Sequence, residues 1–346
     1  MGTQPPRPGP AERAAGPVLA ADPTTSRWWA SIADTDPVTV EPPDPLELPA
    51  RLVDLAVPHE DIDAIVRAVA TMAADPAYVE VLGRWCGRLH EAMEDPTVRF
   101  FDVPDLVGVL GEDHRWFHVH AYLAMLPSVA RRHERLGVPA DVTRRTLADL
   151  GRHLARERRR TGRGGLGTAQ WLTLHQRGLI FQLGRLQFER ATLFGPYARV
   201  MRSAGEDAEE GEPVLSVHIP ALFGPMSPAA CDASFARARA FFARHLPDER
   251  YRYVICHSWL LDGQLTRYLR PTSNIVAFRD RFEGFGPPDE APADASVVNF
   301  VTGRDLGDVA ELPRTTSLER AIADHLRTGG HWHTVLGWAR WPSAAA

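Results

Sequence analysis

The chain has 346 residues, of which 44% are hydrophobic, and a net charge of −5 at pH 7, values typical of a soluble globular protein with two domains. It contains no lysine, so its 39 basic residues are all arginines, which excludes Schiff-base and pyridoxal phosphate catalysis and a Walker A loop. The nearly balanced charge argues against a protein dedicated to nucleic-acid binding.

The cysteines and the apolar stretches indicate a compartment. Cys86, Cys231 and Cys256 lie far apart without paired spacing, which predicts a reducing environment and no disulfide framework. No apolar stretch approaches the length of a membrane span, and the N-terminus lacks the apolar core of a signal peptide. We therefore expect a cytoplasmic protein with no membrane partner and no nucleic-acid partner.

The first half of the chain is predicted to be helical after a disordered arm. Residues 1–45 are rich in Pro, Ala, Asp and Thr and lack periodicity, which is typical of disorder. Residues 46–165 show helical spacing of apolar residues, with helix starts after Pro58 and at Asp75. The segment GRGGLG at 162–167 follows a helix rather than a strand, so we interpret it as an interdomain linker and not as a dinucleotide-binding loop.

The second half, residues 170–342, is predicted to combine strands and helices. Residues 179–190 indicate one long strand or two, and a helix is expected from Ser317. Three further short segments are predicted as strands: 197–202, 275–282 and 296–303. The fold class expected from these patterns is α+β, with an all-α N-terminal domain followed by a mixed-sheet C-terminal domain.

A strand–loop–helix–strand unit at residues 214–262 is the most informative part of the sequence. Its helix begins at Ser227-Pro228, a hydroxyl N-cap followed by proline at the first helical position. Because a helical crossover joins parallel strands, we expect the two strands to be adjacent and parallel. Their carboxyl ends would then meet the helix N-terminus at one edge of the sheet, where anions and other ligands bind.

Each of the two strands carries a histidine near its end, and the first is His218. Alternation places Ser216 and His218 on one face of the strand and Leu215 and Val217 on the other. An imidazole at this position is a candidate general base. The alternative is a strand-end histidine bound to a backbone carbonyl.

His257 is the histidine of the second strand. Alternation places His257 and Trp259 on one face and Cys256 on the other, so Cys256 is interpreted as a buried core thiol rather than as a nucleophile paired with His257. His257 is the second candidate base. Trp259 is interpreted as the wall of a substrate pocket or as part of the core.

Two further groups are candidates for chemistry. Glu189, at the end of LQFER, could activate a nucleophile through water, although an exposed strand carboxylate is the alternative. His114 and His118 share a helix face, but no nearby Cys or HExxH glutamate completes a metal site. We expect no metal cofactor.

The segments LGRLQFER, VLSVHIP, SPAACDASFARARAFF and YVICHSWLLD, in this order, resemble bacterial two-domain acyltransferase-like proteins. These pair a helical N-acyltransferase N-terminal domain with a GNAT-like C-terminal domain, and the resemblance covers about residues 47–340. It implies that two splayed strands admit an acyl thioester and that the following helix N-terminus receives its pyrophosphate. The cofactor contacts that it implies would come from the loop and the helix start: Ile219, Ala221, Gly224 and Ser227.

The phosphate loop departs from the usual GNAT pattern. The stretch HIPALFGPMSPAA has one glycine, no basic side chain, and prolines that cannot donate backbone hydrogen bonds. The expected donor is therefore either an acyl-CoA or the thioester of an acyl carrier protein.

The resemblance and the histidines together predict an N-acyltransferase-like enzyme. A small-molecule amine would attack the thioester carbonyl directly, His218 or His257 would accept its proton, and a backbone N–H near Ile219 would hold the oxyanion. We expect both imidazoles to line one cleft, with Glu189 or Trp259 on its wall. The alternative is a catalytically silent GNAT-like small-molecule-binding or scaffold protein.

Overall fold

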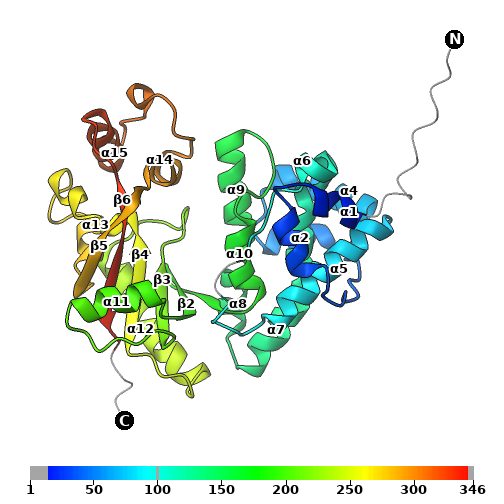
Figure 1. Cartoon of the computed structure of the whole chain (residues 1–346), viewed down its shortest axis with the longest axis horizontal. Coiled ribbons are helices and arrows are strands. Elements are labelled where there is room, and N and C mark those ends of the chain that lie inside the picture. The colour runs from blue at the N-terminus through cyan, green and yellow to red at the C-terminus, as the bar shows by residue number, and fades with distance from the viewer. Residues whose placement is uncertain (1–14, 99–100, 342–346) are drawn as a thin grey trace. The chain divides into compact units, whose positions relative to one another are not determined.

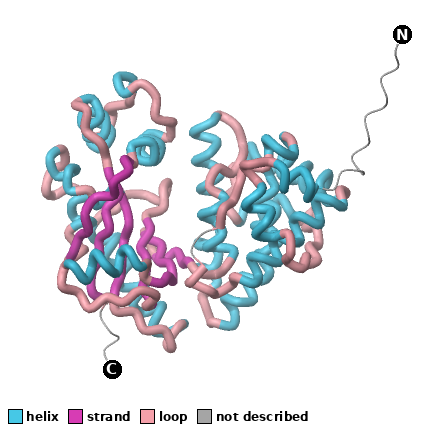
Figure 2. Tube along the Cα trace, in the orientation of Figure 1, coloured by secondary structure: helices cyan, strands magenta, loops and turns pink. Residues whose placement is uncertain are grey.

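The computed structural model describes residues 15–98 and 101–341, which form two compact units (Figure 1). The N-terminal unit contains the described residues up to His133, together with Leu147–Arg158 and Arg163–Gly178. The C-terminal unit contains Glu134–Thr146, Arg159–Gly162 and the described residues from Leu179 onward. The expected α+β class is confirmed, because the strands all belong to the C-terminal unit in the part of the chain that is described (Figure 2).

The N-terminal unit is built from helices. They are α1 (Ala15–Ala21), α2 (Ser26–Ile32), α3 (Leu48–Asp54), α4 (His59–Ala73), α5 (Pro76–Glu91), α6 (Val107–Leu110), η2 (Glu112–Trp116), α7 (Phe117–Arg135), α9 (Asp149–Thr161) and α10 (Ala169–Gln176). The predicted start at Asp75 is confirmed, since its side chain accepts a hydrogen bond from the Ala77 N–H and caps α5. Among the described residues, no helix combines the length and the apolar character needed to cross a bilayer.

The prediction of a disordered arm was wrong for residues 15–32, while residues 1–14 lie outside the described part. Helices α1 and α2 place Leu19 and Trp28 in the core, and the Trp28 ring lies 5.7 Å from the Trp85 ring of α5. Gly87 of α5 permits close approach of the segment that follows α2, because a Cβ at Gly87 would lie 2.6 Å from the Asp36 carbonyl oxygen. Non-local burial of large apolar side chains therefore outweighs the local composition.

Three histidines of α7 are held uncharged by their surroundings. Burial lowers the pKa of His118 and of His133 to about 4, and that of His120 to about 3. His118, which the sequence placed on one face with His114, has its Nε2 2.9 Å from the Pro104 carbonyl oxygen and donates to it. These side chains are packed as neutral groups.

The C-terminal unit is built around one six-stranded sheet. Its elements are α8 (Ala140–Leu147), β1 (Ile180–Leu183), β2 (Leu186–Thr192), α11 (Gly195–Ser203), β3 (Pro213–His218), α12 (Pro228–His245), β4 (Tyr253–Ser258), η3 (Trp259–Leu261), η4 (Gly263–Arg267), α13 (Asn274–Arg279), β5 (Gly284–Pro292), α14 (Asp294–Thr302), η5 (Val309–Glu311), α15 (Ser317–Arg327) and β6 (His333–Arg340). The strand order is β1-β2-β3-β4-β6-β5, and β3–β4 is the parallel pair, whereas the other neighbours are antiparallel. The predicted parallel pairing across α12 is therefore confirmed.

Other local predictions had mixed outcomes. Residues 179–190 form two strands joined by a tight turn at Gly184, and the helix from Ser317 is present. The strand predictions for the three short segments were wrong, because these segments fall in helices α11, α13 and α14. In α13 the Ser273 side chain accepts from the Val276 N–H, a cap that favours helix over strand.

The two faces of the sheet are covered by different helices. Leu215 of β3 and Cys256 of β4 belong to one core cluster with Phe241 and Phe242 of α12. The opposite face packs Val214, Tyr253 and Ile255 against Ala198 and Met201 of α11, which crosses the front of the sheet in Figure 1.

Candidate functional site

The parallel pair β3–β4 is short. Leu215 pairs with Val254 and Ser216 pairs with Ile255, and no later pair follows although both strands continue for two or three residues. His218 and His257 lie beyond the last β3–β4 pair, although His218 still pairs with β2 and His257 with β6. Alternation from Ser216 and Ile255 puts both histidines on the α11 face of the sheet.

His218 pairs with Glu189, which comes from the neighbouring strand β2. In the antiparallel register Glu189 lies opposite Ser216 and Gln187 lies opposite His218, so the two side chains are diagonal neighbours on one face. The His218 Nε2 is 2.6 Å from the Glu189 Oε2, with 23% of the histidine side chain and 13% of the glutamate side chain exposed.

This pairing determines which imidazole nitrogen can act as a base. An ionised carboxylate only accepts hydrogen bonds, so the His218 Nε2 carries the hydrogen that Glu189 accepts. The Nδ1 atom then holds the lone pair that can receive a proton. An imidazole oriented by a carboxylate is an arrangement found in general bases.

His257 has its own carboxylate partner. Its Nε2 lies 3.0 Å from an oxygen of Asp289 on β5, and the Tyr197 ring of α11 lies 5.1 Å from the imidazole. This second pair is more exposed, at 31% for His257 and 46% for Asp289. No pattern in the sequence points to Asp289, which lies in the proline-rich stretch GPPDEAP.

Cys256 and Trp259 lie away from these pairs. Cys256 is buried on the α12 face, and burial raises the pKa of its thiol to about 12, so the interpretation as a core thiol is confirmed. Trp259 does not continue the alternation with His257, because the strand ends at Ser258 and a short helical turn begins. Its ring packs in the α12-side cluster, 5.9 Å from the Phe300 ring.

The loop between β3 and α12 contains the four residues expected to contact a cofactor. Ile219 and Ala221 are half-buried, and Gly224 is exposed with a φ of +78°. Ser227 is occupied as the helix cap, because its hydroxyl accepts from the Ala230 N–H at 3.3 Å. Since Pro228 has no N–H, the helix start itself offers few donors to an anion.

A basic side chain from another segment supports this loop. Arg185, in the turn between β1 and β2, donates from Nε to the Gly224 carbonyl at 2.9 Å and from Nη1 to the Pro220 carbonyl at 3.2 Å. Burial lowers its pKa, although it stays a cation at neutral pH. Arg281 donates in a similar way to the Pro228 carbonyl at 2.9 Å. Sequence reasoning missed both guanidinium groups, because neither lies in the loop.

Comparisons with known proteins give matches to two domain families. Residues 47–178 match the N-acyltransferase N-terminal domain family, and residues 180–339 match the GNAT-like C-terminal domain family. Comparison with curated proteins gives no match.

Solved structures of acyltransferases resemble the whole chain. A mutant acyltransferase in complex with octanoyl-CoA has a TM-score of 0.84 and 33% identity, over 95% of this chain and 100% of that chain. An acyltransferase in complex with decanoyl-CoA and teicoplanin has a TM-score of 0.81 and 33% identity, over 95% of this chain and 98% of that chain. The chain therefore belongs to the acyltransferases in which an N-acyltransferase N-terminal domain precedes a GNAT-like C-terminal domain.

Proposed function

We propose that this protein transfers an acyl group from an acyl-CoA to the amine of a small-molecule acceptor by direct attack. The observation that carries the proposal is the His218–Glu189 pair at the end of β3, where the pairing with β4 has stopped. Similar acyltransferases were solved with octanoyl-CoA and decanoyl-CoA, which favours coenzyme A as the donor.

The proposed reaction forms one bond and breaks one. The acceptor nitrogen attacks the thioester carbonyl carbon, and its proton passes to the Nδ1 of His218, while Glu189 stabilises the imidazolium that forms. The tetrahedral intermediate then expels the coenzyme A thiolate, which takes up a proton. No side chain is acylated, which agrees with the burial of Cys256.

The loop after β3 is proposed to hold the donor. The backbone N–H of Ile219 would stabilise the oxyanion, and the amides at Ala221 and Gly224 would face the pyrophosphate. Leu222 and Gly224 have φ values of +56° and +78°, and residues of left-handed conformation occur in anion-binding nests. Arg185 provides the positive charge that the loop itself lacks and restrains two of its carbonyls.

Decanoyl-CoA with an amine acceptor tests the proposal. Teicoplanin, which a similar acyltransferase binds, and a panel of small primary amines are the first acceptors to try. We expect thiol release that depends on the acceptor, and an acceptor product that has gained one decanoyl group by mass spectrometry. His218→Ala should lower kcat by about 10²- to 10⁴-fold, the usual contribution of a general base, while decanoyl-CoA still binds.

The same experiment separates the enzyme from a silent binding protein. Binding of decanoyl-CoA without transfer to any acceptor in a broad amine panel would favour the binding protein. Full activity in His218→Ala would refute the assigned base, and loss of activity in His257→Ala alone would transfer that role to the second histidine.

A further inference from the structure

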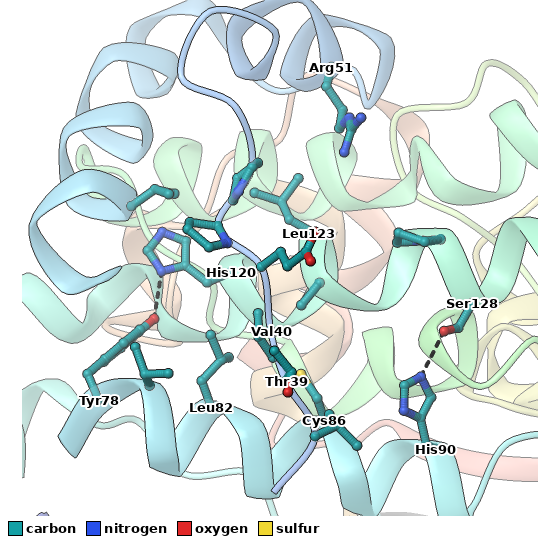
Figure 3. Close-up of a pocket in the computed structure, with 18 of the residues that line it drawn as sticks. Thr39, Val40, Arg51, Tyr78, Leu82, Cys86, His90, His120, Leu123 and Ser128 are labelled. Carbon is teal, nitrogen blue, oxygen red and sulfur yellow. Dashed lines mark hydrogen bonds between the residues drawn. The ribbon is translucent and has the colours of Figure 1, made fainter. Parts of the chain in front are cut away.

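Two buried hydroxyl groups show different uses of a polar side chain inside this protein. In the cavity of about 610 Å³ in the N-terminal unit, the Tyr78 hydroxyl lies 2.6 Å from the His120 Nδ1, so two side chains of the lining bond to each other (Figure 3). The hydroxyl of Ser234, in the C-terminal unit, bonds instead to the backbone of a turn that carries a residue of the candidate site.

Ser234 is a fully buried polar residue on the apolar face of α12. The other buried residues of this helix are Cys231, Ala238, Phe241 and Phe242. A hydroxyl in such surroundings needs hydrogen-bond partners. It donates to the Ala230 carbonyl at 2.8 Å, and its oxygen accepts from the N–H groups of Arg185 at 2.7 Å and Leu186 at 3.3 Å.

The two N–H groups belong to the turn between β1 and β2. Gly184 in this turn has a φ of +85°, and a Cβ there would lie 2.7 Å from the Ser234 Oγ, so the turn fits against α12 only without a side chain at this position. A second side chain, Gln182, donates from Nε2 to the Gly184 carbonyl at 2.8 Å. The backbone of the turn is therefore held through both its N–H and its carbonyl groups.

Arg185 is the side chain that leaves this turn toward the loop between β3 and α12. Its Nε and Nη1 donate to the carbonyls of Gly224 and Pro220. Its Nη2 has no hydrogen-bond partner within residues 15–98 and 101–341, so this nitrogen can donate to an anion. Since a guanidinium reaches two carbonyls at once only from one position, its geometry depends on where the turn lies.

We propose that Ser234 is a positioning residue, whose hydroxyl holds the β1–β2 turn where Arg185 can support the loop and meet the donor. Without the hydroxyl, the N–H groups of Arg185 and Leu186 lose a buried acceptor, and the turn moves to find another. The inference rests on the proposed function, because it requires an acyl-CoA at this loop.

Calorimetric titration with decanoyl-CoA tests the inference. Ser234→Ala should raise the Kd about 5- to 10-fold, the effect of about one hydrogen bond. Because the hydroxyl bonds to the turn and not to the His218–Glu189 pair, kcat at saturating decanoyl-CoA should change less than about 3-fold. An unchanged Kd in Ser234→Ala, beside a wild-type chain that binds, would overturn the inference alone. No binding to the wild-type chain would refute the proposed donor and this inference with it.

Thr302→Val is the matched control for the loss of a buried hydroxyl. Thr302 of α14 is 8% exposed, donates to the Val298 carbonyl four residues earlier at 2.8 Å, and accepts from the Arg304 N–H at 3.1 Å. Both substitutions should lower the unfolding midpoint in urea, whereas only Ser234→Ala should weaken decanoyl-CoA binding. An equal rise of Kd in Thr302→Val would assign the effect to stability and overturn the inference.

A double-mutant cycle shows whether Ser234 acts through Arg185. The variant with both Ser234→Ala and Arg185→Gln should bind decanoyl-CoA about tenfold more weakly than the wild type, as Arg185→Gln alone should. An additive loss of about 50- to 100-fold would mean that Ser234 acts independently, and would overturn the inference. If Ser234→Ala does not fold, Ser234→Cys takes its place, because a thiol is close in size and accepts hydrogen bonds only weakly.

Discussion

Replacing Glu189 by glutamine removes one negative charge beside His218 and keeps the size of the side chain. The pair is largely shielded from water, with 13% of Glu189 and 23% of His218 exposed, and the two atoms are 2.6 Å apart. A hydrogen bond to a charged group is worth about 1.5–3 kcal/mol. In the proposed reaction the imidazolium forms as His218 takes the proton, so this loss should appear in kcat. At about 1.4 kcal/mol for each factor of ten, kcat should fall about 10- to 150-fold.

Steady-state kinetics with decanoyl-CoA and the best acceptor of the panel measures this effect. The KM for decanoyl-CoA should change little, because the Glu189 carboxylate bonds to His218 and not to a residue of the loop that is proposed to hold the donor. Asp289→Asn is the matched control, since it makes the same chemical change at the second histidine–carboxylate pair, and it should lower kcat less than about 3-fold by the same scale. A large effect of Asp289→Asn together with wild-type kcat in Glu189→Gln would refute the choice of His218 as the base.

Three other predictions concern the loop, the packing and the acid stability of the chain. Arg185→Gln should raise the Kd of decanoyl-CoA about tenfold by calorimetry, because the loop loses the two hydrogen bonds from Arg185 to its carbonyls. The control Arg239→Gln, at an exposed arginine, should leave the Kd unchanged, and an equal effect of both substitutions would contradict the role of Arg185. Gly151→Ala should destabilise the N-terminal unit by about 3 kcal/mol or more, because its Cβ would lie 2.0 Å from the Ala56 carbonyl oxygen; an unchanged midpoint in urea would show that the backbone yields. Between pH 7 and pH 5, hydrogen-exchange protection should fall in α7 and not in α12. In the unfolded state the three α7 histidines bind protons below about pH 6.5, whereas in the folded state they do so only at pH 3–4. At pH 5 this difference lowers the free energy of unfolding by about 2 kcal/mol for each histidine. An equal decrease of protection in α12 would contradict this reasoning.

The parts of the fold that were predicted correctly have local causes. The start of α12 at Ser227-Pro228 combines a side-chain cap with a proline of suitable φ, and both act within one turn of the chain. The alternation in β3 and β4 likewise needs no distant partner, so the faces of His218 and His257 could be assigned before the sheet was known. That the two faces are the same face of the sheet depends in addition on the β3–β4 register, in which Ser216 pairs with Ile255.

The strand predictions that were wrong relied on apolar composition and missed the caps. In α14 the C-terminal signal is Gly303, which has a φ of +70° in the left-handed conformation that ends many helices. In α11 the signal is Pro196 in the first turn. Segments of this length have weak intrinsic preferences, and the caps together with burial against the rest of the unit determine the outcome.

The site partners depend on contacts that no local pattern contains. Glu189 was selected as a candidate, but its pairing with His218 depends on the register of β2 against β3. Asp289 and Arg185 reach the site from segments more than 30 residues away from their partners in the chain. Such contacts follow from the three-dimensional assembly of the sheet rather than from spacing in the sequence.

The C-terminal unit includes a segment that lies more than 30 residues before its main part, which begins at Leu179. This has a practical consequence for producing the unit as a separate fragment. Residues 134–146 belong to this unit, Val138 is buried in its main cluster, and the Thr146 hydroxyl accepts a hydrogen bond at 2.9 Å from the Gln182 N–H of the edge strand β1. A recombinant fragment that starts at Leu179 would expose this apolar surface and leave the strand edge open, which favours aggregation. Soluble expression of the C-terminal unit should therefore require residues 134–146 as well, supplied by circular permutation or as a separate peptide.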